Sequence, residues 1–122
     1  MNFSTWDLAG HPDYYVIHQC FLTPNSLYIV VWNLTLGEEG VVGYNRDEKL
    51  KLPAIQINPT STIGAGDAYN AGIVFYIEKN GYSRSDTGDL SFSSFKELLQ
   101  TGIEFSTEVC GTIENYVRKG FR

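Results

Sequence analysis

The apolar residues of the first half fall into short runs that predict strands. The stretch from Leu27 to Leu34 is almost continuously apolar, which is typical of a strand buried on both faces of a parallel sheet. A short strand at residues 2–6 and a helix at residues 14–22 precede it, so this piece is predicted as strand, helix, strand. Pro24 and Asn25 end the predicted helix.

A hairpin and two helices are predicted in the second half. Residues 41–44 and 50–57 are extended stretches on either side of a charged turn at residues 45–49, and Pro53 favours an edge strand. Between Ala65 and Glu78, small or apolar residues recur at helical spacing, and an Asn-Gly pair follows as a stop: Ala68, Ala71, Gly72, Phe75, Asn80, Gly81.

The last predicted helix starts from a capping box. Ser94-x-x-Glu97 has the pattern of such a box, and Gly111 is expected to end or bend the helix. Its apolar residues repeat at helical spacing and predict an inward face: Phe95, Leu98, Leu99, Gly102, Phe105, Val109.

Size and composition limit the chain to one compact, soluble domain. It has 122 residues, of which 43% are hydrophobic and 19% charged, and no apolar run is long enough for a membrane span. Asp7 lies early in a start that has no basic residues, which does not resemble a secretory signal, so we expect a cytoplasmic protein. Cys20 and Cys110 lie far apart without metal-ligand spacing, and both are expected to be core residues.

The net charge of the chain indicates which ligands are unfavourable. A formal charge of −5 without a Lys/Arg cluster argues against nucleic-acid and anionic-membrane surfaces. Any phosphate must therefore be held mainly by backbone amides.

The segment Gly64-Ala65-Gly66-Asp67 has the residues that such a phosphate site needs. Glycines allow a tight turn whose N–H groups face one point, and a helix starting there adds the positive end of its dipole. Asp67, in the first turn, is placed to accept the proton of an attacking alcohol as a general base. The alternative is a plain glycine loop followed by an acidic residue, which any helix N-terminus favours.

The longer string resembles the catalytic signature of the ribokinase-like (PfkB) sugar kinases. In that family Gly-Ala-Gly-Asp is followed by a small residue, an aromatic residue and Asn-Ala-Gly, and residues 68–72 match throughout. The resemblance covers residues 41–122, the carboxy-terminal part of that fold. Nothing in the chain matches the family's amino-terminal Gly-Gly sugar-binding motif or its lid.

The PfkB resemblance implies a set of functional residues. Asp67 would be the catalytic base, the amides of Gly64, Ala65 and Gly66 the anion hole, and ATP with Mg²⁺ the phosphoryl donor. Thr62 and Asn70 would also contact the cofactor, as would a helix end near the adenine pocket that contains Ser106, Thr107, Val109 and Cys110; the alternative for that end is plain burial. Ser61 replaces the Asp with which the family binds a monovalent cation, so that cation is not expected.

Residues 3–39 resemble a different family, the Roc GTPase domain of the leucine-rich-repeat kinases and other Roco proteins. The match rests on Trp6-Asp7-x-x-Gly10 after a strand, a helical segment with His11 and His18, and a strand containing Val-Trp-Asn-Leu. It implies that Asp7 reaches Mg²⁺ through water, that Gly10 contacts a γ-phosphate and that His11 influences the hydrolytic water. The alternative is a simple turn at the end of a strand.

The chain contains neither a phosphate-cradling Gly-x-x-x-x-Gly-Lys-Ser/Thr loop nor a guanine-selecting motif, so independent GTP turnover is not expected. His11 and His18 lack a third ligand at suitable spacing, and no metal site is predicted.

These readings predict an α/β fold of α/β/α layers around a mostly parallel sheet. Residues 1–40 would form a Ras-like strand–helix–strand fragment of Roc type and residues 41–122 the PfkB-like segment, packed as one domain. Our hypothesis is that the chain is a recombined or fused product. Three functions stay open: a kinase for a sugar or nucleoside hydroxyl, a Roc-type GTP-binding or partner-binding fragment, and an inactive chimera. Oligomerisation is compatible with each.

Overall fold

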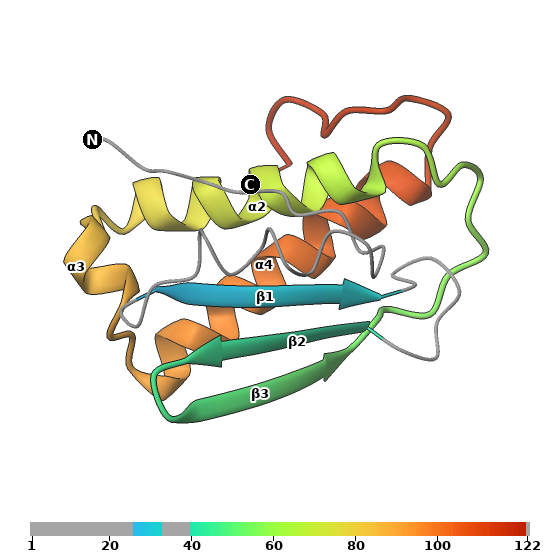
Figure 1. Ribbon diagram of the computed structural model, residues 1–122. Helices are drawn as coiled ribbons and strands as arrows, with labels where there is room; N and C mark the ends of the chain where they lie inside the picture. The colour runs from blue at the N-terminus through green and yellow to red at the C-terminus, as the bar shows by residue number, and fades with distance from the viewer. Residues whose placement is uncertain (1–25, 33–39, 122) are drawn as a thin grey trace, which may run out of the picture.

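Three strands form a small sheet in the computed structural model, which describes residues 26–32 and 40–121 (Figure 1). They are β1 (Leu27–Trp32), β2 (Gly40–Asn45) and β3 (Glu48–Pro53), arranged in the order β1-β2-β3. Both pairs are antiparallel, with Val30 opposite Val42 and Val42 opposite Lys51. The predicted hairpin is confirmed, and its turn consists of two residues, Arg46 and Asp47.

The prediction of a mostly parallel sheet is wrong for the described strands. Seven residues separate β1 from β2 and two separate β2 from β3. A parallel pair needs a crossover of about a dozen residues or more, so these short connections permit antiparallel pairing only. A continuous apolar run indicates burial, and burial alone does not determine strand direction. The fold class itself is α/β.

The helices lie on one side of the sheet (Figure 1). They are α2 (Ala65–Lys79), the short α3 (Arg84–Thr87) and α4 (Phe92–Cys110). Of these, α4 contacts β2 and β3, and α2 packs along α4. A Cβ on Gly72 of α2 would lie 2.8 Å from the carbonyl oxygen of Thr101 and 2.9 Å from Cα of Gly102. Glycine is therefore required at this point of the contact between the two helices.

The apolar face predicted for α4 is confirmed, because all six of its residues are buried: Phe95, Leu98, Leu99, Gly102, Phe105, Val109. The face predicted for α2 is correct only in part. Ala68 and Gly72 are buried and Phe75 is half-buried, but Ala71 is exposed. Because Gly72 marks the line of contact with α4, its neighbour Ala71 is turned about 100° away from that line.

The start of α4 differs from the prediction. Ser91, not Ser94, is the N-cap, and its side chain accepts a hydrogen bond from the Ser94 N–H at 3.3 Å. The hydroxyl of Ser94 instead accepts one from the Tyr82 hydroxyl at 3.0 Å. A capping box does occur one element earlier, where Ser83 and Asp86 satisfy each other's backbone at the start of α3. The capping box predicted for α4 is therefore wrong: the helix begins three residues earlier, with a simple serine cap.

Asn45 links the end of β2 to the segment between α3 and α4. Its side-chain N–H donates to the carbonyl oxygen of Thr87 at 2.8 Å, and its side-chain oxygen accepts from the N–H of Leu90 at 2.9 Å. The side chain is 2% exposed. Both halves of this buried amide are satisfied, which fixes the chain just before α4 begins.

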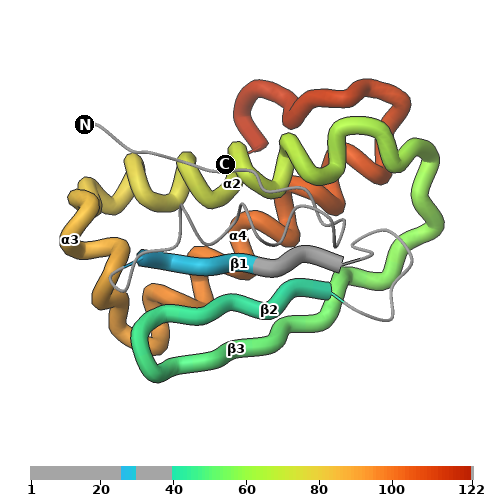
Figure 2. Tube along the Cα trace, in the orientation of Figure 1, coloured from blue at the N-terminus to red at the C-terminus, as the bar shows by residue number. Residues whose placement is uncertain are grey.

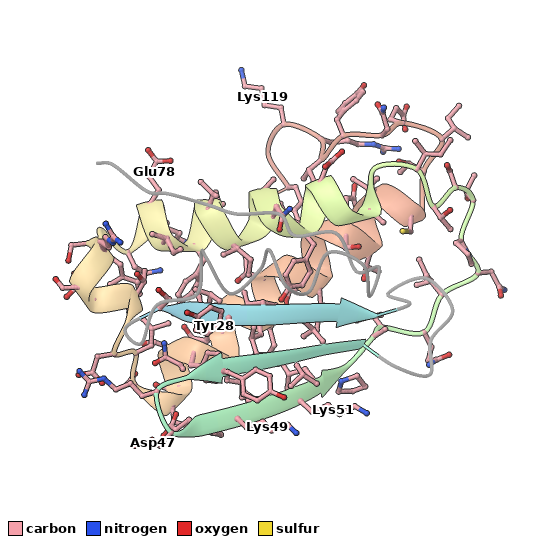
Figure 3. The ribbon with its side chains drawn as sticks, in the orientation of Figure 1. Tyr28, Asp47, Lys49, Lys51, Glu78 and Lys119 are labelled. Carbon is pink, nitrogen blue, oxygen red and sulfur yellow. The ribbon has the colours of Figure 1, made fainter. Side chains whose placement is uncertain are left out.

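The opposite face of the sheet carries charged and aromatic side chains. Tyr28, Lys49 and Lys51 lie on the face turned away from α4 (Figure 3). The ammonium of Lys49 lies 5.6 Å from the centre of the Tyr44 ring, a cation–π distance. Lysines on an edge strand also disfavour pairing with another sheet.

The elements predicted at residues 2–6 and 14–22 lie outside the described residues. Within the described part of the chain, no helix is both long and apolar enough to cross a membrane.

Candidate functional site

The segment that leads into α2 runs beside the segment that follows α4 (Figure 2). Two backbone N–H groups, those of Thr60 and Ser61, donate to the carbonyl oxygen of Cys110 at 2.8 and 3.4 Å. The Thr60 hydroxyl also donates to the carbonyl oxygen of Gly111 at 3.4 Å. The start of α2 is therefore anchored to the C-terminal end of α4.

Gly64 is the N-cap of α2 and has a left-handed backbone, with φ 83°. That conformation costs an L-residue with a side chain about 1–2 kcal/mol. A Cβ at this position would also lie 3.0 Å from the carbonyl oxygen of Asn115. Both the backbone and the packing therefore require glycine here.

Two amide groups in the first turn of α2 have no partner within the part of the chain that the structure describes. No described side chain caps the helix. The N–H of Ala65 donates to the Thr62 carbonyl at 3.3 Å and that of Ala68 to the Gly64 carbonyl at 2.8 Å, whereas those of Gly66 and Asp67 have no hydrogen-bond partner among the described residues. Unpaired N–H groups at a helix start bind anions, and the helix dipole adds to the attraction.

The side chains around these amides leave the helix start open. A Cβ added to Gly66 would meet no atom of the described residues within 4 Å. Asp67 is exposed in the first turn, and Asn70, one turn later, is exposed as well. The structure thus brings a carboxylate acceptor and two amide donors to one accessible surface.

Ser61 and Thr62 form hydrogen bonds within the loop that precedes Gly64. The hydroxyl of Ser61 accepts a hydrogen bond from the N–H of Ile63 at 3.2 Å. Thr62 is exposed, and its carbonyl oxygen accepts from Ala65. Together they form the turn that precedes Gly64.

A pocket of about 530 Å³ lies at the C-terminal end of α4, and Thr107 lines it. The Thr107 hydroxyl donates to the carbonyl oxygen of Ile103 at 2.7 Å. Since Gly111 both lines the pocket and accepts from Thr60, the pocket adjoins the loop that leads into α2. The full lining is Ile55, Glu104, Thr107, Glu108, Gly111, Thr112, Arg118 and Phe121.

Cys110 does not line this pocket with its thiol, contrary to the role that the sequence resemblance implied. The residue is 1% exposed, and burial raises the pKa of its thiol. Ser106 and Val109 are likewise buried against the core. All three lie on the inward face of α4, as the alternative of plain burial expects, and the Cys110 backbone carbonyl oxygen accepts the Thr60 amide hydrogen bond.

Several pocket residues were missed from sequence. Arg118 and Phe121 lie in a tail without helical or strand periodicity, and Ile55 lies within the stretch predicted to be extended, just beyond the observed end of β3 at Pro53. The Phe121 ring packs edge-on against Phe105 with centroids 5.3 Å apart. The signal in the sequence for this packing was Phe121 itself, an aromatic residue in a polar tail. The GTPase-like residues Asp7, Gly10 and His11 lie outside the described residues.

The family model for pfkB family carbohydrate kinases matches residues 8–106 of this chain. The chain belongs to the pfkB family. The match extends on both sides of residue 41, where the sequence resemblance began, and contains the loop and helix start described above. It also contains β1, so the antiparallel sheet lies within the pfkB match.

Curated proteins of two kinds are similar to parts of this pfkB chain. The fructokinase of Rhizobium leguminosarum bv. trifolii is 42% identical over 41 residues, which are 34% of this chain and 13% of that enzyme. The ribokinase of Lactococcus lactis subsp. lactis is 38% identical over 47 residues, 38% of this chain and 16% of that enzyme. The leucine-rich repeat serine/threonine-protein kinase 1 of Mus musculus is 49% identical over 41 residues, 34% of this chain and 2% of that protein.

Both resemblances seen in the sequence are therefore confirmed as similarities. The chain spans between 2% and 16% of the length of these three relatives. Similarity to two kinds of protein is consistent with a chimeric origin.

Proposed function

We propose that this chain carries the phosphate loop and catalytic base of a pfkB-type kinase, which transfers the γ-phosphate of ATP to the hydroxyl of a sugar or nucleoside. The observation that carries the proposal is the uncapped start of α2, where the N–H groups of Gly66 and Asp67 have no described partner and the Asp67 carboxylate is exposed in the same turn. Family membership supports the reaction class.

The geometry at the start of α2 supports phosphoryl transfer as the reaction. The transferred group carries negative charge on its oxygens, and preorganised N–H donors at a helix start offset that charge. A carboxylate beside those donors removes the proton of the attacking hydroxyl as the new bond forms. The loop is anchored by the Thr60 and Ser61 amides on the Cys110 carbonyl oxygen, and Gly64 adopts the left-handed conformation with which α2 begins.

We propose that Mg²⁺ binds together with the phosphates of ATP. Among the described residues, no three His, Cys, Asp or Glu side chains gather into a metal site. That suits Mg²⁺, which is usually held by one or two carboxylates together with substrate phosphates and water. Asp67 is the described carboxylate nearest to the open amides along the chain. The turn formed by Ser61 offers no carboxylate for a monovalent cation.

The pocket beside α4 is proposed to hold the base of the donor. It adjoins the loop through Gly111 and Thr60, so a nucleotide with its phosphates at α2 has its nucleoside on this side. Thr107, which lines the pocket, is the residue that the sequence resemblance placed near adenine.

The test is ATP-dependent phosphorylation over a panel of hexoses, ribose, deoxyribose and nucleosides. Asp67→Asn should lower the rate by about 10²-fold or more with only a small change in melting temperature, since the carboxylate is exposed and loses only its interaction with the helix dipole. Asp47→Asn, in the hairpin turn, is the matched control and should be active (Figure 3). A rate that does not depend on Asp67 contradicts the proposal.

A second candidate, a Roc-type guanine-nucleotide switch or partner-binding fragment, rests on the similarity to the mouse protein. A ligand that binds only the folded state raises the melting temperature. Stabilisation by GTP rather than ATP favours this candidate. If neither nucleotide stabilises the protein at millimolar concentration, the chain is an inactive chimera.

A further inference from the structure

Glu108 is an unusual residue in the wall of the pocket. It lies in the last turn of α4, is half-buried and has no hydrogen-bond or ion-pair partner among the described residues. A carboxylate is unfavourable at this end of a helix, where the dipole is negative, and no basic residue occupies that turn. Helix stability therefore does not explain its presence.

Arg118, the basic residue among those that line the pocket, already forms an ion pair. The guanidinium of Arg118 lies 3.6 Å from a carboxylate oxygen of Glu114, four residues earlier. Glu108 and Glu104 are spaced one turn apart on α4 and both line the pocket, so this side of the cavity is acidic. An ionised carboxylate only accepts hydrogen bonds, and the wall therefore favours a ligand edge that donates them.

The remaining walls suit a flat ring. Ile55 and Phe121 also line the pocket and add apolar surface to it, and the Phe121 ring packs against Phe105. Aromatic side chains stack on the face of a nucleobase, and apolar side chains pack against it, whichever base is present. Base identity then depends on polar groups that meet the edge of the ring, as in other small-molecule sites.

We propose that Glu108 is a specificity-determining residue that accepts a hydrogen bond from the exocyclic amino group of the donor's base. The donor site then selects amino-bearing bases such as adenine and rejects bases that lack the amino group. This inference rests on the proposed function, because it takes the pocket as the base site of a nucleotide whose phosphates bind at α2.

The experiment compares adenosine with purine riboside, which differs from it only by the absence of the 6-amino group. Binding is followed through the backbone amide NMR signals of Thr107, Glu108 and Gly111. Wild-type protein should bind adenosine about tenfold more tightly, the effect of one hydrogen bond to a charged group. Glu108→Leu should abolish that preference without weakening purine riboside, and Glu108→Gln, which keeps one acceptor oxygen, should retain part of it.

Glu78→Leu is the matched control. Glu78 is exposed on α2, away from the pocket, and the same charge is removed (Figure 3). This variant should keep the tenfold preference. Equal binding of the two nucleosides to wild type, or a preference that survives in a folded Glu108→Leu variant, overturns the inference.

Inorganic tripolyphosphate separates failure of this inference from failure of the proposed function. It has no base and reports only on the amides of residues 64–67. If it binds there while neither nucleoside shifts the pocket signals, the base site is wrong and the phosphate loop stands. If tripolyphosphate and ATP both fail to bind, the proposed function falls, and the role of Glu108 falls with it.

Discussion

Gly64 lies directly against Asn115, on a segment 51 residues further along the chain. A Cβ on Gly64 would come within 3.0 Å of the Asn115 carbonyl oxygen and 3.2 Å of its Cβ. Real Cβ contacts are rarely this short, so Asn115 would have to shift by a few tenths of an ångström to admit a side chain. The shape of the phosphate loop thus depends on a distant segment as well as on its own glycines.

Gly64→Ala should lower the free energy of unfolding by about 1–2 kcal/mol, because an L-residue is strained at φ 83° and also meets Asn115. Urea denaturation measures the change. Gly66→Ala is the matched control: its Cβ meets nothing within 4 Å, and alanine is favoured inside a helix by about 0.5–1 kcal/mol. That variant should be as stable as wild type or more so. Equal destabilisation of both would contradict the loop geometry described here.

Asn45→Ala should destabilise the fold by about 2–4 kcal/mol. The substitution leaves both the Thr87 carbonyl and the Leu90 N–H without their buried partner, and each such loss costs roughly 1–3 kcal/mol. Asp89→Asn serves as the comparison, because it removes only the exposed ion pair with Arg46, which should change stability by less than about 1 kcal/mol. Equilibrium unfolding in urea ranks the two, and the reverse order would exclude a structural role for Asn45.

Tyr69→Phe should leave stability unchanged or raise it by about 1 kcal/mol. The Tyr69 side chain is 1% exposed and its hydroxyl has no hydrogen-bond partner among the described residues, so the variant removes an unsatisfied buried group. Tyr76→Phe makes the same chemical change at a hydroxyl that donates to the Glu97 carboxylate at 3.0 Å. That variant should lose about 1 kcal/mol. Thermal melting of the pair measures the difference, and an equal loss in both would show that Tyr69 has a partner.

Stability should fall as the pH rises above about 10. Burial, followed by the hydrogen bond to Glu97, raises the pKa of Tyr76 from 10.0 to about 12. As the pH rises, the unfolded chain loses the tyrosine proton before the folded protein does. Between pH 10.0 and about 12 the unfolded state therefore binds fewer protons, and the free energy of unfolding decreases. Urea midpoints below and above about pH 10 measure the loss, which should be smaller in Tyr76→Phe. If Tyr76→Phe loses as much stability above pH 10 as the wild-type protein does, Tyr76 is excluded as the cause of the loss.

The secondary structure was largely predictable because it follows from local periodicity. The six inward residues of α4 and the hairpin of β2 and β3 were both found from spacing. Strand direction was not, since the apolar run of β1 fits any buried strand. The N-cap of α4 was also misplaced: the helix begins at Ser91, directly after the Leu90 amide that Asn45 holds, and the Ser94 hydroxyl bonds Tyr82.

The candidate site divides in the same way. A short contiguous string contains the loop and Asp67, and its chemistry follows from residue type and a helix start. The pocket was found only in part, through Thr107, because Ile55, Glu108 and Phe121 come from three separate segments that share no pattern.

The sequence by itself determined the turn, the helix and the family, since each is encoded over a few consecutive residues. Only the tertiary structure decided that the Gly66 and Asp67 amides stay open, that Asn115 packs against Gly64, and that the Cys110 thiol is buried while Glu108 faces a cavity. The physical reason is that these relationships join residues far apart in the chain. Their distances are set by the packing of α2 on α4 rather than by any local preference.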